Sequence, residues 1–211
     1  MPDRAVVFVD GSNWYFSLKE AGISIPGDVA LGKVSRKLVG AAREWVGTRY
    51  YTGRVNQQEA PDGYAKQRRF LSRLLQDPKI SAHFGRLETR PASNDLAEEL
   101  SQYMAGLRMR IDMTVFQNLV KMAQRHRKVM VTQEKAVDVM LSVDLVLMGH
   151  RNEYDAAYLL TADGDYTPAV KAVREIGKKV YCASPATGAQ LAAAANSWIP
   201  LKPSFFDDCL Y

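Results

Sequence analysis

The sequence predicts an α/β fold with a mainly parallel sheet that is flanked by helices. Three observations lead to this prediction. Short apolar runs rich in β-branched residues alternate with segments of helical pattern, as they do in βαβ units. Several runs are apolar on both faces, which is typical of strands buried in a parallel sheet. Acidic residues directly follow two of the runs, at the end where open α/β sheets bind ligands.

The expected strands are apolar runs bounded by turn-forming residues. The first covers residues 5–9 and is followed by Asp10-Gly-Ser-Asn13, whose composition is that of a turn. The others cover residues 47–55, 83–89, 129–132, 157–161, 180–183 and 198–201.

The expected helices lie between these strands, over residues 14–21, 31–45, 62–75, 134–148, 167–176 and 189–195. One of them has clear boundaries: Thr167 caps it, Pro168 occupies its first position, and Gly177 ends it. The apolar residues of segment 134–148 go almost all the way round the helix, which predicts a buried helix.

We expect residues 1–211 to form one domain with a helical insertion at residues 92–128, a stretch rich in Met, Leu and Arg. The composition, with 47% hydrophobic and 24% charged residues, is that of an ordinary globular protein. No segment approaches the roughly 18 apolar residues of a membrane-spanning helix, and the N-terminus lacks a signal-peptide pattern. A cytoplasmic protein without membrane contact is therefore expected.

Overall charge and cysteine content say little about function. The 28 basic and 23 acidic residues give a formal charge of +5, which allows a polyanionic partner without requiring one. Cys182 and Cys209 have no metal-binding spacing, and the three histidines share no motif.

Carboxylates gather at one edge of the predicted sheet. Asp10 closes the first strand, and Asp163 and Asp165 follow a later one. Asp138 lies in a largely apolar helix, where an ionised carboxylate is costly unless a cation or hydrogen bonds compensate it. Asp144 lies about 120° round that helix from Asp138 and about 9 Å further along its axis, so the two carboxylates cannot easily bind the same ion. We therefore favour Asp138 for the site and Asp144 for a neighbouring cap or structural bond.

Converging carboxylates repel one another, and a divalent cation relieves that repulsion. Ligand sets made only of oxygen atoms suit Mg²⁺ or Mn²⁺, and such ions serve phosphodiester chemistry. A single Asp-Gly pair is usually no more than a turn. The coincidence of Asp10-Gly-Ser-Asn13, Asp138 and Asp163-Gly-Asp165 in one βαβ pattern favours a metal site.

Three segments together resemble the motifs of NYN domains. Phe8-Val-Asp-Gly-Ser-Asn13 resembles their opening motif, and Glu134-Lys-Ala-Val-Asp138 resembles their central helix. Leu160-Thr-Ala-Asp-Gly-Asp-Tyr-Thr-Pro168 is similar to their third motif. Alanine stands at position 136 in place of an expected glycine, and at 162 in place of glycine or asparagine. Neither difference removes a carboxylate.

NYN domains are similar to PIN nucleases, so the resemblance implies a Rossmann-like sheet, an aspartate-bound Mg²⁺ or Mn²⁺, and cleavage of RNA. It implies that Asp10, Asp138, Asp163 and Asp165 are metal ligands or water activators. It also implies that Asn13 is a polar helper in catalysis.

A basic helix offers a binding surface for a phosphate backbone. Arg68, Arg69 and Arg73 crowd together there with Tyr64 and Phe70 between them. The alternative is an ordinary solvated helix face. Ser12 and Lys135, which belong to the first two motifs, are further candidates for substrate binding. The expected partner is nucleic acid, RNA in the first place, and a homo-oligomer is compatible with the sequence.

Three other functions compete with a metal-dependent endoribonuclease. A small-molecule phosphohydrolase with an aspartyl nucleophile would carry a second aspartate at position 12, where this chain has Ser12. A nucleotide-binding switch would need a glycine-rich phosphate loop, and neither common type occurs. A catalytically silent RNA-binding or regulatory adapter on the same fold stays open, as do DNA as substrate and exonucleolytic cleavage.

Overall fold

The structure is a computed structural model that describes residues 2–23, 26–93, 99, 102–107, 110–126 and 128–211. The chain divides into two compact units. The first, here called the sheet unit, consists of Met1–Arg86 and Glu134–Tyr211, and the second, the insertion unit, of Leu87–Gln133. Every residue discussed below as part of the candidate site belongs to the sheet unit.

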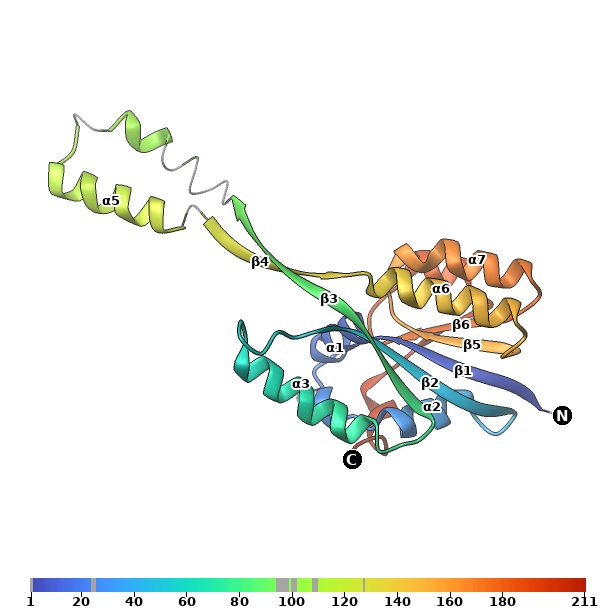
Figure 1. The fold of residues 1–211 in the computed structure, drawn as a ribbon. Helices are drawn as coiled ribbons and strands as arrows, with labels where there is room; N and C mark the ends of the chain where they lie inside the picture. Colours follow the sequence, from blue (N-terminus) through green and yellow to red (C-terminus); the bar gives the residue numbers. More distant parts are fainter. Residues whose placement is uncertain (1, 24–25, 94–98, 100–101, 108–109, 127) are drawn as a thin grey trace. The chain divides into compact units, whose positions relative to one another are not determined.

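The sheet has seven strands in the order β4-β3-β2-β1-β5-β6-β7 (Figure 1). Their bounds are β1 Asp3–Asp10, β2 Arg43–Arg54, β3 Ile80–Ser93, β4 Lys128–Lys135, β5 Ala156–Leu160, β6 Lys179–Ser184 and β7 Ser197–Pro200. All pairings from β3 through β2, β1, β5 and β6 to β7 are parallel. The predicted mainly parallel sheet is confirmed. The chain progresses outward from β1 in both directions, so a topological switch point lies between β1 and β5.

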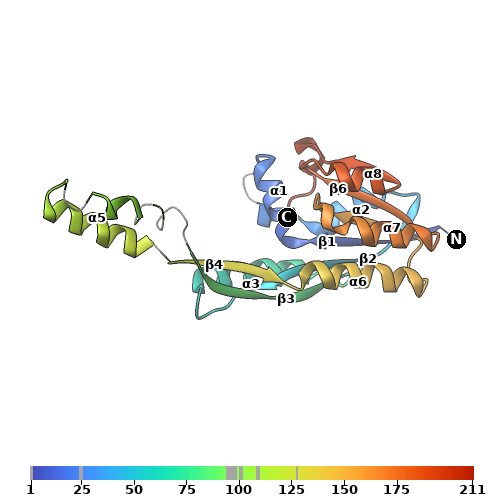
Figure 2. The ribbon, with the colours of Figure 1, turned by 90° about the horizontal axis from the view of Figure 1, so that it is seen from above.

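Helices cover both faces of this sheet, as predicted (Figure 2). The α-helices are α1 Gly11–Glu20, α2 Leu31–Val39, α3 Pro61–Leu74, α5 Met113–His126, α6 Val137–His150, α7 Thr167–Glu175 and α8 Ala189–Ala194. Short 3₁₀ turns are η1 Pro26–Asp28, η2 Gly164–Tyr166 and η3 Pro203–Phe206.

Alternate residues of β1 enter two separate hydrophobic cores. Val7 and Val9 pack in the cluster that contains Trp14 of α1 and Val34 of α2. Phe8 packs in the opposite cluster with residues of α6 and α7. Because successive strand side chains point to opposite faces, one apolar run supplies both cores.

Two predicted helices have different ends in the structure. The helix expected at 31–45 stops at Val39, because Gly40 adopts a left-handed φ of 69° and the chain enters β2 at Arg43. The helix expected at 134–148 begins only at Val137. The two residues before its N-cap belong to β4, and Ala136 turns the chain with a left-handed φ of 69°.

Two further expectations about helices are wrong. Helix α6 is not buried all round, since Val139 and Val143 are 65% and 46% exposed while Leu141 and Leu145 lie in the core. Thr167 does not cap α7, because the N-cap position is Tyr166 and no side chain provides a capping hydrogen bond. Gly177 follows the end of α7 with a φ of 82°, as expected of a helix-terminating glycine.

The insertion unit contains helix α5 and a helical stretch at residues 102–105. Parts of the predicted insertion, at 94–98, 100–101, 108–109 and 127, lie outside the described residues, so its helical character is observed only in part. Within the ranges described, no helix is both long and apolar enough to cross a membrane.

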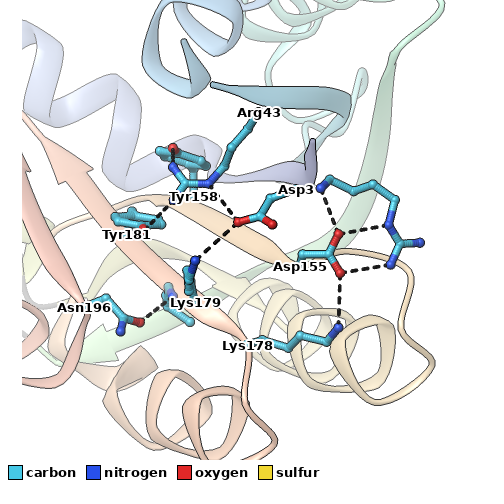
Figure 3. A network of polar contacts seen from close by, with 10 residues as sticks. Asp3, Arg43, Asp155, Tyr158, Lys178, Lys179, Tyr181 and Asn196 are labelled. Atoms are coloured by element: carbon cyan, nitrogen blue, oxygen red, sulfur yellow. Dashed lines mark hydrogen bonds and ion pairs between the residues drawn. The ribbon is translucent and has the colours of Figure 1, made fainter. Parts of the chain in front are cut away.

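Charged residues and tyrosines at the amino ends of the strands form a network of polar contacts, here called the amino-edge network (Figure 3). The carboxylate of Asp155 accepts hydrogen bonds from the Arg4 guanidinium at 3.1 Å and lies 3.5 Å from the Lys178 ammonium. Asp3 lies 3.3 Å from the Lys179 ammonium. Every carboxylate in this network therefore faces cations.

Arg43 completes the amino-edge network at the start of β2. Its guanidinium donates hydrogen bonds of 2.8 and 2.7 Å to the hydroxyls of Tyr158 and Tyr181, whose rings stack 5.0 Å apart. Its Nε lies 3.7 Å from Asp3. The network thus ties β1, β2, β5 and β6 together at the edge opposite to the predicted site.

Candidate active site

The predicted aspartates lie at the carboxyl edge of the sheet, at the switch point between β1 and β5. Asp10 is the last residue of β1 and the N-cap of α1, where its carboxylate accepts a 3.1 Å hydrogen bond from the Asn13 backbone N–H. Asp163 comes shortly after the end of β5, which pairs directly with β1. Asp10 and Asp163 therefore follow adjacent strands at the carboxyl edge, and binding of one ion by both side chains stays a prediction.

One tyrosine hydroxyl joins two of the predicted acids. The hydroxyl of Tyr166 lies 3.1 Å from a carboxylate oxygen of Asp10 and 3.0 Å from one of Asp138. A hydroxyl has a single proton, so it donates fully to only one of the two carboxylates at a time. Asp10 is buried with 4% exposure, whereas Asp138 is exposed in the first turn of α6. The two negative charges therefore share one donor.

The charge on Asp10 is poorly compensated. The pKa of Asp10 is raised to about 6, chiefly by burial, and the neighbouring carboxylates of Asp138 and Glu134 make smaller contributions in the same direction. Hydrogen bonds from Asn13 and Tyr166 act in the opposite direction but are weaker. In the part of the chain that is described, neither Asp10 nor Asp138 makes a salt bridge.

The Tyr166 hydroxyl itself stays protonated. Burial raises the pKa of Tyr166 far above its ordinary value, and the charges of Asp10 and Asp138 add to the shift. Tyr166 therefore acts as a hydrogen-bond donor and not as an acid. Sequence reasoning gave this residue no role, although it directly follows the Asp163-Gly-Asp165 motif. The turn of η2 is what brings it back to Asp10.

Glu134 is a second residue that the sequence interpretation missed. It was expected in a helix but lies in β4, where its side chain accepts a 2.5 Å hydrogen bond from the Ser12 hydroxyl. It also accepts a hydrogen bond from the Gly53 backbone N–H. Its place beside the first motif depends on the tertiary path of the chain, because β2 and β3 separate β4 from β1 in the sheet. Ser12, a candidate for substrate contact, is occupied by this bond.

A chain of hydrogen bonds through Thr161 links the remaining predicted acids, Asp163 and Asp165, to Asp10. Thr161 donates a 3.4 Å hydrogen bond to Asp10 and accepts one of 3.1 Å from the Asp163 backbone N–H. The Asp163 carboxylate in turn caps η2 by accepting a 3.0 Å bond from the Asp165 N–H. Asp163 is half-buried and Asp165 is exposed. Their part in binding a metal ion stays a prediction.

Asn13 links the first motif to the third. Its amide oxygen accepts a 2.9 Å hydrogen bond from the Ala162 backbone N–H, which fixes α1 against the loop after β5.

Gly11 is required because a side chain at this position would clash with its neighbours. A Cβ there would lie 2.6 Å from the Tyr50 hydroxyl and 2.7 Å from the Tyr51 carbonyl oxygen. Gly11 and Asn13 both hold the motifs in place, and the predicted catalytic role of Asn13 stays a prediction.

Asp144 makes the structural bond that the sequence analysis favoured. Its carboxylate accepts hydrogen bonds of 2.7 Å each from the Arg49 guanidinium and the Tyr51 hydroxyl. Burial opposes ionisation, but these two bonds hold the pKa of Asp144 below its ordinary value. Asp144 therefore stabilises the packing of α6 on β2.

The donor set at the carboxyl edge fits a hard divalent cation. Among the described residues no three acidic, histidine or cysteine side chains converge into a complete set of protein ligands. Mg²⁺ commonly needs only one or two carboxylates, with water and substrate phosphates filling its other positions. Asp10 and Asp138 provide such a pair, and a cation would compensate the buried charge on Asp10.

A groove of about 1420 Å³ runs between α1 and α3 and reaches Gly11 and Ser12 beside the site. Arg68 and Arg69 are exposed on α3 and line it. Arg73 also lines it, but its guanidinium is held by Asp28 at 2.9 Å and by the Gly27 carbonyl at 3.2 Å.

Lys135 is half-buried at the end of β4. Its side chain makes no hydrogen bond or ion pair with any residue that the structure describes. A contact between Lys135 and substrate stays a prediction.

Comparison with known proteins places the chain in a family. One solved structure, a protein of unknown function from Vibrio parahaemolyticus, has a TM-score of 0.59 and 17% identity over 100% of this chain and 97% of its own. At this identity the similarity supports the fold alone. A comparison with curated proteins finds no significant match. The family model of the NYN domain matches residues 4–202, and the chain therefore belongs to the NYN domain family.

Proposed function

We propose that this protein is a metal-dependent nuclease that hydrolyses phosphodiester bonds, with RNA as its first candidate substrate. NYN domains are a PIN-like nuclease family. The observation that carries the proposal is the pair of carboxylates, Asp10 and Asp138, that share the Tyr166 hydroxyl and form no salt bridge with any residue that the structure describes. Such a pair suits a site whose missing positive charge is supplied by Mg²⁺ or Mn²⁺.

In this mechanism Asp10 and Asp138 would hold the ion, and Asp163 and Asp165 would contribute directly or through water. A bound Mg²⁺ or Mn²⁺ would polarise the scissile phosphate and lower the pKa of a water molecule. Tyr166 keeps the two carboxylates at hydrogen-bond distance from one hydroxyl, which presets the spacing of the ligands.

Residues around the acids position this centre. Asn13 holds the loop that carries Asp163, and its amide remains a candidate for orienting a phosphate oxygen. Arg68 and Arg69 would bind the phosphate backbone from the groove. Lys135 is a further candidate for substrate contact, and Ser12 would have to exchange its bond to Glu134 for one to substrate. Because Arg73 is already paired with Asp28, we assign it a smaller share in binding substrate.

The test is cleavage of labelled single- and double-stranded RNA and DNA with Mn²⁺, by wild type and by Asp10→Asn. Asparagine keeps the shape of the side chain and removes the charge, so we expect a loss of about 100-fold or more in rate. Asp144→Asn is the matched control: it removes a carboxylate from α6 outside the site, and activity should persist wherever the variant remains folded.

Equal rates for wild type and Asp10→Asn would refute the proposal. Absence of any cleavage, together with tight binding of RNA, would favour the silent adapter instead. Hydrolysis of small phosphate esters but not of nucleic acids would favour the phosphohydrolase.

A further inference from the structure

The groove between α1 and α3 has an aromatic wall that the metal site does not explain. Tyr15 and Phe16 are neighbours in α1, line the groove, and remain 47% and 59% exposed. Their rings meet edge to face at 5.6 Å. Tyr64 and Phe70 of α3 line the same groove, and Phe70 packs on Tyr50 at 5.4 Å.

The charges in the groove are positive and available. Lys66, Arg68 and Arg69 line it, and none of them forms a salt bridge with any residue that the structure describes. Asp28 is the acidic side chain among the lining residues, and it is paired with Arg73. A groove with aromatic faces and unpaired cations matches an occupant that has flat rings and negative charges.

We propose that this groove is a binding subsite for unpaired nucleic acid, in which bases stack on Tyr15 and Phe16 and phosphates contact Lys66, Arg68 and Arg69. Stacking requires bases that are free of a partner strand, so the subsite selects single-stranded segments over duplex. The residues that line the groove include Gly11 and Ser12, which directly follow Asp10, so a strand in the groove would pass close to the start of α1, where Asp10 lies. This proposal extends the nuclease proposal by naming the form of its substrate.

The test measures binding in the presence of EDTA, where metal-dependent cleavage cannot occur. Fluorescence anisotropy would compare three labelled ligands: an unpaired oligoadenylate, an abasic oligomer of the same length, and a duplex. The proteins are wild type, Tyr15→Leu/Phe16→Leu, Arg68→Gln/Arg69→Gln, and Tyr103→Leu as control. Tyr103 is an exposed tyrosine, 69% accessible, outside the groove.

For wild type we expect the oligoadenylate to bind at least tenfold more tightly than the abasic oligomer or the duplex. Tyr15→Leu/Phe16→Leu should lower the affinity for oligoadenylate to the abasic level and leave abasic binding unchanged. Replacing both with tryptophan should restore the preference. Arg68→Gln/Arg69→Gln should weaken the binding of all ligands. For the single strands it should flatten the log–log salt dependence by about 1.4, since each phosphate contact on a single strand contributes roughly 0.7. Tyr103→Leu should behave as wild type.

Unchanged oligoadenylate affinity in Tyr15→Leu/Phe16→Leu would overturn the proposal, as would a wild-type preference for duplex. Wild type that ignores the oligonucleotides but binds an acidic peptide would overturn it too. These results are separable from the nuclease question. Binding through the aromatic wall without cleavage in Mn²⁺ would leave the subsite standing and remove the nuclease proposal. Cleavage in Mn²⁺ at the same rate by wild type and Tyr15→Leu/Phe16→Leu would leave the nuclease proposal standing and remove the subsite.

Discussion

The pKa values of carboxylates at the two edges of the sheet are shifted in opposite directions. At the amino edge, hydrogen bonds from Arg4 hold the pKa of Asp155 well below its ordinary value, and Lys178 adds to the effect. At the carboxyl edge, burial raises the pKa of Asp10 to about 6, with Asp138 and Glu134 as its charged neighbours. The first arrangement stabilises the fold, and the second leaves a negative charge that a ligand can compensate. This contrast separates acids that are paired within the fold from an acid whose charge is poorly compensated.

The largest expected effect on stability comes from removing the poorly compensated charge. The folded-state pKa of Asp10 is about 6, above the ordinary value of about 3.9, so its ionisation destabilises the fold as pH rises between these values. Without metal, Asp10→Asn should therefore be more stable than wild type at pH 7 to 8, by at most about 3 kcal/mol. The gain should disappear below about pH 4. Urea unfolding at several pH values measures this, and a less stable variant at pH 8 would contradict the comparison.

Tyr166→Phe sharpens the account of the carboxyl edge. It keeps the buried ring and removes the hydroxyl between Asp10 and Asp138. In wild type the hydrogen bond from this hydroxyl lowers the pKa of Asp10. We expect a loss of about 1–3 kcal/mol that is larger at pH 8 than at pH 5. Tyr154→Phe is the control, because that buried hydroxyl donates to the Leu145 carbonyl away from the acids. Equal pH dependence in both variants would show that Tyr166 is merely a packed tyrosine.

Asp155→Asn tests the amino edge. Its depressed folded-state pKa contributes stability above about pH 4, and that contribution is lost as pH falls toward the folded-state value. Since Asp155 and Arg4 are about one-third exposed, solvent screens the pair, and the melting temperature at pH 7 should fall by roughly 2–4 °C. The difference from wild type should narrow below pH 4. Glu153→Gln is the control: it removes a weak 4.0 Å ion pair with Arg151 and should leave the melting temperature unchanged.

The smallest expected effect concerns the backbone at the start of α6. Ala136 holds a left-handed φ of 69°, which glycine adopts without strain. Ala136→Gly should stabilise the protein by about 1 kcal/mol or less. In the described chain the non-glycine residues with a positive φ are Ala136 and Asn152. Ala162→Gly is the control, because Ala162 does not have a positive φ. It should be neutral or destabilising, and a gain at both positions would argue against a strained turn.

Much of this architecture could be predicted because apolar runs such as residues 5–9 pack on both faces of the sheet. The aspartates at strand ends followed from that pattern, since parallel strands bring their carboxyl ends to one edge. Local exceptions were missed. Gly40 ends α2 through its backbone conformation, and Glu134 belongs to a strand although its neighbours favour a helix. Tyr166 reaches Asp10 only through the tertiary path of η2, which no spacing in the sequence reveals.

The central claim is that the carboxyl edge, and not the amino edge, is built to receive a divalent cation. The most direct measurement is the melting temperature with increasing Mn²⁺ at pH 7.5 for wild type, Asp10→Asn and Asp155→Asn. Saturating Mn²⁺, at about 100 times its dissociation constant, should stabilise wild type and Asp155→Asn by about 2.7 kcal/mol, or roughly 5–10 °C. Asp10→Asn should show no shift. Equal shifts in all three proteins, or none in wild type at millimolar Mn²⁺, would contradict the claim.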